Sequence, residues 1–189
     1  MRIGIDFDDT IVYTSNRLKE YIENYDASKK EKKRITDNLR YIIMGDLSTL
    51  DRKLVDKIML DVLYSLQIKE NVIEVIERLK NSGHEIYIIT ARADMIYPGF
   101  EKATYDMLLR YKIPYNKVIF GTYDHKLSEC KNNKIDLMID DSVDIISYLI
   151  ENGVNGLLMS SGVNSKIEND LPKVESWLEI EEYINKEIK

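Results

Sequence analysis

Short apolar runs alternate with amphipathic stretches along most of this chain, and this alternation constrains the fold more than any other feature. The runs are rich in isoleucine, valine, leucine or tyrosine, as are strands buried on both faces of a parallel sheet. They are Arg2–Asp6, Glu85–Thr90, Lys117–Gly121, Ile135–Asp140 and, more weakly, Gly156–Met159.

The stretches between these runs have the pattern of helices with one apolar face. Residues 71–81 place valine, isoleucine and leucine at helical spacing, and Gly83 follows as a stop signal. We expect further helices at Phe100–Tyr111, Val143–Asn152 and Ser176–Lys186. Strands and helices in alternation are joined by right-handed crossovers, so the sequence predicts an α/β fold with a doubly wound, Rossmann-like parallel sheet.

One segment after the first strand interrupts this alternation. It has no strand-like run, and its helical stretches lie near Arg17–Tyr25, Lys29–Met44 and Asp51–Leu66. Ligands of open α/β sheets bind beyond the carboxyl ends of the strands, where such an insert would act as a lid. We therefore expect an α/β core domain of residues 1–14 and 70–189, with a small helical cap subdomain of residues 15–69.

Charge and cysteine content narrow the classes of partner and location. The net charge of −6 disfavours a nucleic acid polymer as partner. The lone Cys130 allows no disulfide within the chain, and nothing indicates an oxidising compartment. The first residues do not read as a signal peptide, and no run approaches the roughly 18 apolar residues of a membrane span. We expect a cytoplasmic protein without a membrane partner, either a monomer or a homodimer.

Polar clusters lie at or between the ends of the predicted strands. They are Asp6, Asp8 and Asp9 after the first strand, Thr90, Ala91 and Arg92 at the second, Asp140 and Asp141 at the fourth, and Lys126 between the third and fourth. Because the carboxyl ends of parallel strands share one edge of the sheet, we expect these clusters to converge.

Carboxylates gathered in this way need a counter-charge. They repel one another, and some would protonate unless a cation lay among them. Oxygen ligands without a histidine or cysteine cluster favour Mg²⁺ over zinc, and Mg²⁺ usually completes its coordination with water and a substrate phosphate. The acids therefore predict Mg²⁺ as cofactor and a small phosphorylated substrate as partner.

The Asp-x-Asp spacing of Asp6 and Asp8 suggests how that phosphate reacts. Side chains two positions apart can point to the same side, so one carboxylate can attack phosphorus while the other exchanges a proton with the leaving oxygen. The candidate substrate-binding residues are Thr90, Ala91, Arg92 and Lys126. Lys131 and Lys134 are alternatives to Lys126, and Arg92 either contacts phosphate or pairs with a surface acid.

These clusters resemble the four motifs of the haloacid dehalogenase superfamily, in the same order. Asp6-Phe7-Asp8-Asp9-Thr10 resembles the first motif, Asp-x-Asp-x-Thr/Val, and Ile88-Ile89-Thr90 resembles the second. Lys126 is the candidate for the lone lysine of the third motif, and Asp140-Asp141 resembles the acidic fourth. The matched frame covers about residues 1–14 and 70–160.

The resemblance implies a role for each acid. Asp6 is expected to be the nucleophile and a magnesium ligand, and Asp8 to be the general acid/base that also offers its backbone carbonyl to the metal. Asp141 is expected to be the third protein ligand, with Asp140 in support, while Thr90 and Lys126 hold the phosphoryl group. An acid at the position of Asp8 accompanies phosphatases and phosphotransferases, which implies a phosphatase acting through an aspartyl-phosphate.

A narrower resemblance bears on the substrate. Residues 113–121, Lys126 and residues 135–142 are similar to the bacterial branch of the 5′(3′)-deoxyribonucleotidase family, which implies a nucleoside monophosphate. Mammalian members stack the base on cap aromatics including tryptophan, whereas Trp177 here is near the C-terminus and Tyr13 is the best aromatic candidate. The alternatives are a phosphatase of a sugar phosphate or other small metabolite and, in a different class, a non-catalytic phosphate-ligand-binding protein.

Overall fold

The computed structural model describes residues 1–24, 28–30, 32–33 and 61–187 of the chain, and within them six strands form one parallel sheet. Its strand order is β3-β2-β1-β4-β5-β6, with β1 at the centre. The bounds are β1 Arg2–Ile5, β2 Glu85–Thr90, β3 Lys117–Phe120, β4 Leu137–Asp140, β5 Asn155–Met159 and β6 Lys173–Val174. Every neighbouring pair runs parallel, which confirms the predicted α/β class.

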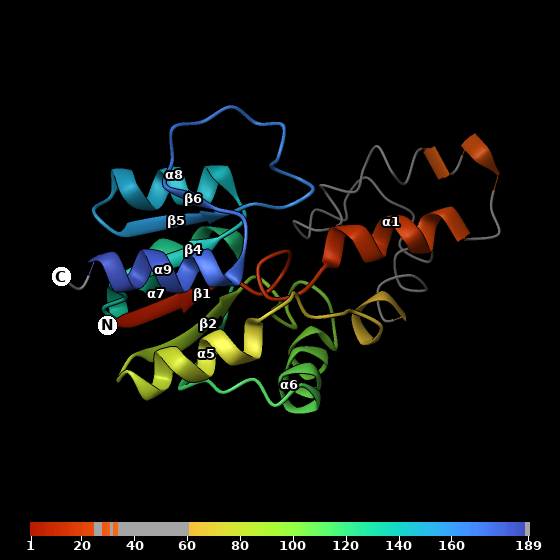
Figure 1. Ribbon diagram of the computed structural model, residues 1–189. Coiled ribbons are helices and arrows are strands. Elements are labelled where there is room, and N and C mark those ends of the chain that lie inside the picture. The colour runs from red at the N-terminus through yellow and green to blue at the C-terminus, as the bar shows by residue number, and fades with distance from the viewer. Residues whose placement is uncertain (25–27, 31, 34–60, 188–189) are drawn as a thin grey trace.

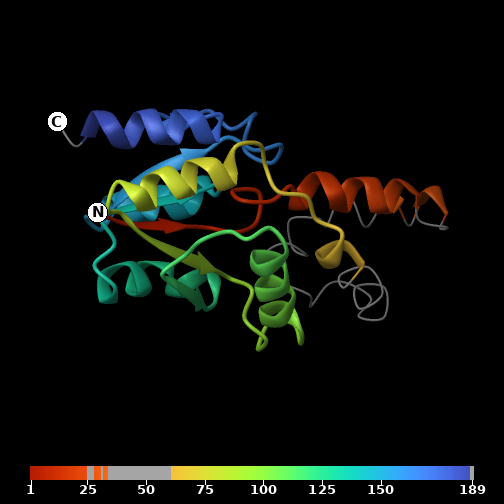
Figure 2. The ribbon, with the colours of Figure 1, turned by 60° about the horizontal axis from the view of Figure 1, so that its bottom comes forward.

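Helices cover both faces of this sheet. Those that pack on it include α5 Val72–Asn81, α7 Lys126–Asn132, α8 Val143–Glu151 and α9 Trp177–Glu187. The other described elements are α6 Phe100–Arg110, a 3₁₀ turn η2 at Tyr123–His125, and α1 Thr14–Asn24, which extends away from the sheet in Figure 1. Figure 2 shows α5 and α9 together on one side of the sheet and α7 on the other. In the described ranges, no helix has both the length and the apolar character needed to cross a membrane.

The strand sequences explain this two-sided burial, because successive side chains of a strand point to opposite faces. In β2, Ile88 joins the buried cluster that includes α5 and α9, whereas Ile89 joins the cluster that includes α7 and α8. Gly4 of β1 faces Met138, and a Cβ at position 4 would lie 2.7 Å from the Met138 sulfur. A larger residue at position 4 would therefore require the Met138 side chain to shift.

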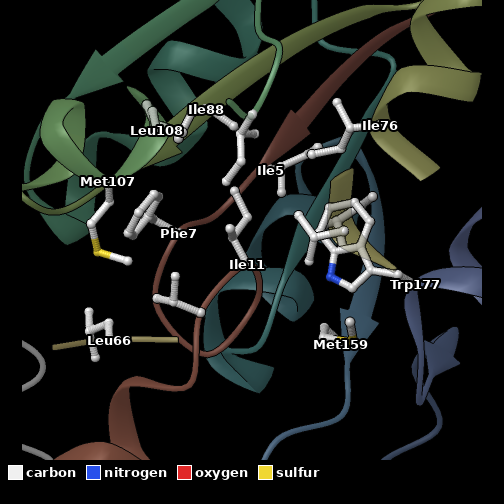
Figure 3. Close-up of a cluster of buried hydrophobic side chains, with 14 of the residues drawn as sticks. Ile5, Phe7, Ile11, Leu66, Ile76, Ile88, Met107, Leu108, Met159 and Trp177 are labelled. Atoms are coloured by element: carbon white, nitrogen blue, oxygen red, sulfur yellow. The ribbon is translucent and has the colours of Figure 1, made fainter. Parts of the chain in front are cut away.

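Trp177 closes the core beneath the turn that follows β1. It shares a buried cluster with Ile76 and Met159, and Figure 3 shows these side chains together. Only 1% of Trp177 is exposed, and its indole N–H donates to the carbonyl oxygen of Thr10 at 3.0 Å. The tryptophan near the C-terminus thus supports the backbone of the first acidic motif.

The carboxyl end of β1 leads directly towards α1, as Figure 1 shows. The chain segment that leaves the sheet here runs beside the segment that returns to it. Val12 forms an antiparallel bridge with Ile68, and the Tyr13 N–H donates to the Gln67 carbonyl at 3.0 Å. The described residues on either side of the predicted insert therefore lie next to each other.

The predicted cap itself stays a prediction. Helix α1 occupies most of the helix expected near residues 17–25. The helices expected at Lys29–Met44 and Asp51–Leu66 fall largely outside the described residues, and so does the division of the chain into residues 1–14 with 70–189 and a cap of residues 15–69.

Candidate functional site

A cleft of about 300 Å³ opens where the carboxyl ends of β1, β2 and β4 meet. Its walls come from the segments that follow these strands, from η2 and the start of α7 after β3, and from the loop after β5. The lining residues are Asp6, Asp8, Asp9, Ala91, Tyr123, Lys126, Asp140, Asp141, Ser142, Val143, Asp144, Val163, Asn164 and Ile167. The parallel topology has thus brought together acids that are separated by more than a hundred residues in the sequence.

Three of these acids form a compact group of oxygen ligands. Asp6, Asp140 and Asp141 each offer a carboxylate oxygen, and the three oxygens lie within 4.8 Å of one another. Asp6 directly follows β1 and extends its pairing, because its N–H donates to the Ile139 carbonyl at 2.9 Å. The donors are all hard oxygens on buried or half-buried side chains, and this set suits Mg²⁺.

The electrostatics of the group also fit a cation. Burial, reinforced by Asp140 and Asp8 and opposed by Lys126, raises the pKa of Asp6 to about 7. Burial, with Asp140 and Asp9 adding to it, also raises the pKa of Asp141 well above its usual value. Carboxyls with raised pKa values hold protons that a divalent ion can replace, so the residues present fit the predicted metal.

Lys126 is the lysine that reaches the acids. Its Nζ donates to Asp6 Oδ1 and to Asp140 Oδ2, each at 2.6 Å, and only 5% of the residue is exposed. Burial alone would lower the pKa of Lys126, but the carboxylates of Asp140 and Asp6 raise it. The two alternatives from the sequence, Lys131 and Lys134, are exposed to solvent.

Asp8 is paired with Arg92. The Arg92 Nε donates to Asp8 Oδ2 at 2.8 Å and its Nη2 donates to Oδ1 at 2.6 Å, while the Thr14 hydroxyl donates to Oδ1 at 2.5 Å. Burial tends to raise the pKa of Asp8, but the Arg92 charge and hydrogen bonds outweigh it and lower the pKa. A substrate-binding role for Arg92 stays a prediction.

The other predicted phosphate ligands lie at the end of β2. The Thr90 hydroxyl oxygen is buried and has no hydrogen-bond partner within the described part of the chain. Ala91 lines the cleft. Buried hydroxyls are almost always paired, so the Thr90 hydroxyl leaves a donor available at the end of β2, although Thr90 is not among the described residues that line the cleft.

Comparison with known proteins agrees with this architecture. None of the protein-family models matches the sequence. A crystal structure of a haloacid dehalogenase superfamily hydrolase from Ehrlichia chaffeensis aligns with 100% of this chain and 97% of its own, with a TM-score of 0.57 at 16% identity. A Clostridium acetobutylicum structure described as a "predicted phosphatase" aligns over 98% of both chains, with a TM-score of 0.66 at 12% identity.

The chain has the haloacid dehalogenase fold. A curated Bacillus cereus protein named "Putative nucleotidase" is also similar to it, with 23% identity over 194 residues and 100% of both chains covered. In this chain, the residues after β1, β2 and β4 face one cleft, where the structure places Asp6, Ala91 and Asp141.

The loop after β5 contributes residues to the site that no sequence pattern had indicated as candidates. The Ser161 hydroxyl donates to Asp141 Oδ2 at 3.0 Å, and the Asn164 side-chain N–H₂ donates to the Asp141 carbonyl at 2.7 Å and to the Met159 carbonyl at 2.7 Å. Asn164 is 1% exposed. These bonds fix the direction of Asp141, and such outer contacts are often needed for metal affinity.

Asp9 and Tyr13 lie beside the cleft and have structural contacts. Asp9 has a φ of 51°, and its carboxylate accepts from the backbone N–H of Ser15 at 3.0 Å, which ties the turn to the start of α1. The Tyr13 hydroxyl donates to Glu70, and Tyr13 lines a neighbouring pocket with Lys69 instead of the cleft that contains Asp6. A base-stacking role for Tyr13 stays a prediction.

Proposed function

We propose that this protein is a Mg²⁺-dependent phosphomonoesterase that forms an aspartyl-phosphate on Asp6, and that its substrates are nucleoside monophosphates. The observation that carries the proposal is the contact of Lys126 with both Asp6 and Asp140, beside Asp141, at the end of the cleft. A buried lysine beside three acids places a positive charge where the negative charge of a phosphate and the positive charge of a metal ion would be bound together.

The reaction divides into two displacements at phosphorus. A carboxylate oxygen of Asp6 attacks, the bond from phosphorus to the ester oxygen breaks, and Asp8 gives a proton to that leaving oxygen. A water then attacks the aspartyl-phosphate and gives a proton back to Asp8, which releases inorganic phosphate and restores the Asp6 carboxylate. Covalent catalysis of this kind replaces one difficult step by two easier ones.

The remaining residues bind and orient. Asp6, Asp141 and the backbone carbonyl of Asp8 would hold Mg²⁺, with Asp140 in support, and the bound ion would neutralise charge on the phosphate oxygens. Lys126 keeps one Asp6 oxygen fixed through its 2.6 Å hydrogen bond, which leaves the other oxygen to react. The hydroxyl of Thr90 would donate to a phosphate oxygen, in keeping with its lack of a protein acceptor in the described residues.

Two observations support a nucleoside monophosphate as the substrate, with the nucleoside as the leaving group. The Bacillus cereus relative that aligns over its full length is named as a nucleotidase. The cleft also has apolar wall positions in the loop after β5, where Val163 and Ile167 are each about half exposed. A sugar phosphate or another small phosphorylated metabolite is the alternative, because the same acids would act on any monoester.

A panel of phosphate esters, assayed for phosphate release with Mg²⁺, tests the proposal. We expect release from one or more nucleoside monophosphates, silencing by EDTA, restoration by Mg²⁺, and no turnover by Asp6→Asn. Release from several sugar phosphates and from no nucleotide would overturn the nucleotidase part alone. Tight binding of phosphate without turnover of any ester would instead favour a non-catalytic binding protein.

A further inference from the structure

We infer that Arg92 is a positioning residue that fixes the orientation of the Asp8 carboxylate in the cleft and does not bind the transferred phosphoryl group. This inference rests on the proposed function, in which Asp8, the residue through which Arg92 acts, transfers the proton. Its basis is the two-point contact of one guanidinium with both oxygens of Asp8.

The geometry of this contact restricts Asp8 strongly. Two parallel N–H donors on one planar group hold the carboxylate plane as well as its position. The Thr14 hydroxyl, at the first residue of α1, donates to the same Asp8 oxygen as Arg92 Nη2. Asp8 therefore has contacts from both sides, although 23% of its side chain remains exposed in the cleft.

Arg92 is itself held rigidly. Its side chain is 3% exposed, and its guanidinium lies 4.5 Å from the centre of the Phe7 ring. Phe7 is fully buried in the core, where Figure 3 shows it beside Met107. A cation stacked on a buried aromatic ring has few other orientations. The packing of Arg92 on the core therefore also fixes the position of Asp8.

The same contacts argue against a direct role of Arg92 at phosphate. The described residues that line the cleft include Lys126 and Ala91 but not Arg92. Two of the guanidinium nitrogens are used on Asp8, and the third, Nη1, is buried away from solvent. Lys126 reaches the nucleophile, whereas Arg92 reaches only the residue that transfers the proton.

A double-mutant cycle between Asp8→Asn and Arg92→Lys tests the inference. Lysine keeps the charge but cannot make the two-point contact. We expect Arg92→Lys alone to lower kcat by about 10- to 100-fold, the scale of a misplaced catalytic group, with KM and the inhibition constant of inorganic phosphate changed less than about twofold. In the Asp8→Asn background, which transfers no proton, Arg92→Lys should lower kcat by less than about twofold.

The assay uses 4-nitrophenyl phosphate. Its leaving group needs little protonation, so the Asp8→Asn rate stays measurable, while the second step still needs Asp8 to take a proton from the attacking water. Arg78→Lys is the matched control, because Arg78 makes the same two-point contact with Glu181 on the surface, with both bonds at 2.7 Å. It should leave kcat unchanged. Thermal melting of each variant confirms that it is folded under the assay conditions.

Two results would overturn the inference while the parent enzyme remains active. One is an equal loss of kcat from Arg92→Lys in the parent and in the Asp8→Asn variant. The other is a rise of about tenfold or more in the inhibition constant of phosphate, as expected if Arg92 binds phosphate directly. A parent protein that hydrolyses no ester of the panel would overturn the proposed function, and this inference with it.

Discussion

The ammonium group of Lys126 lies 2.6 Å from Asp6 Oδ1, so the proposed nucleophile is hydrogen-bonded to a buried cation. Replacing Lys126 by methionine keeps the length of the side chain and removes this contact together with the one to Asp140. We expect kcat/KM for any accepted monoester to fall by at least about 10²-fold, because a donor aimed at developing charge in a buried site is worth that much.

Lys131→Met, on the exposed side of the same helix, is the matched control for Lys126→Met and should leave kcat/KM unchanged. Both variants should be measured with saturating Mg²⁺, so that a loss of metal affinity does not enter the comparison. Equal losses in the two variants would remove Lys126 from the site.

Asn164 should set the affinity for Mg²⁺ without touching the substrate. Its side chain holds the Asp141 carbonyl and the end of β5, so alanine would free the loop that orients Asp141. Loss of such an outer contact typically costs about 10- to 100-fold in metal affinity. Titration of activity with Mg²⁺ measures this shift. Asn169→Ala, in the same loop but bonded to Ile167 and Leu171 and not to Asp141, should leave the titration unchanged, and an identical shift there would contradict the assignment.

The stability of the metal-free protein should depend on pH through Asp6. Its pKa is about 7 in the folded protein, against an ordinary value of 3.8, so the folded state binds this proton more tightly than the unfolded state. The stabilisation from this group is complete below its ordinary pKa and is lost as the pH rises through about 7. In EDTA, the contribution of this group should therefore lower the melting temperature between about pH 4 and about pH 7.

Asp6→Asn is the control that isolates this effect, because asparagine does not titrate and His84, whose lowered pKa acts in the opposite direction, is present in both proteins. The decline in melting temperature should be smaller in this variant than in the parent. Mg²⁺ should reduce the decline in the parent, since the ion replaces the proton. Parallel pH profiles for parent and variant in EDTA would show that Asp6 does not titrate in this range.

Trp177→Phe should destabilise the fold and leave the chemistry intact. The variant loses the hydrogen bond to the Thr10 carbonyl, and an unpaired buried polar group costs about 1–3 kcal/mol. Denaturant unfolding measures the free energy, and kcat per folded molecule should be unchanged because Trp177 does not line the cleft that contains Asp6. Leu178→Ala, at a half-exposed position beside it, is the control with an expected effect of less than about 1 kcal/mol. A loss of kcat at unchanged stability would instead place Trp177 in the site.

The sequence was sufficient for the parts of the fold that periodicity determines. The apolar runs at Glu85–Thr90 and Ile135–Asp140 became central strands, because strands buried on both faces must be apolar throughout. The two-residue strand β6 was not anticipated, since Lys173–Val174 has no apolar run and pairs only at the sheet edge. Convergence of the acids followed from parallel topology, which fixes where strand ends meet.

Contacts made through loops could not be predicted in the same way. No spacing rule relates Asn164 to Asp141, because the course of the loop after β5 decides the distance between them. The pairing of Arg92 with Asp8 was also out of reach, although both were singled out, since it depends on the stacking of Arg92 over Phe7. Of the three candidate lysines, Lys126 alone is buried and bonded to the acids, whereas Lys131 and Lys134 are exposed, and sequence cannot supply this difference in burial.

Covalent labelling of the enzyme tests the central claim most directly. The protein, with Mg²⁺, is mixed with an ester that carries labelled phosphorus, quenched in acid within a turnover, and mapped by proteolysis and mass spectrometry. The label should be on Asp6, should disappear on treatment with hydroxylamine, and should be absent from Asp6→Asn. Steady turnover with the label on another residue, or with Asp6→Asn as fast as the parent, would contradict the account.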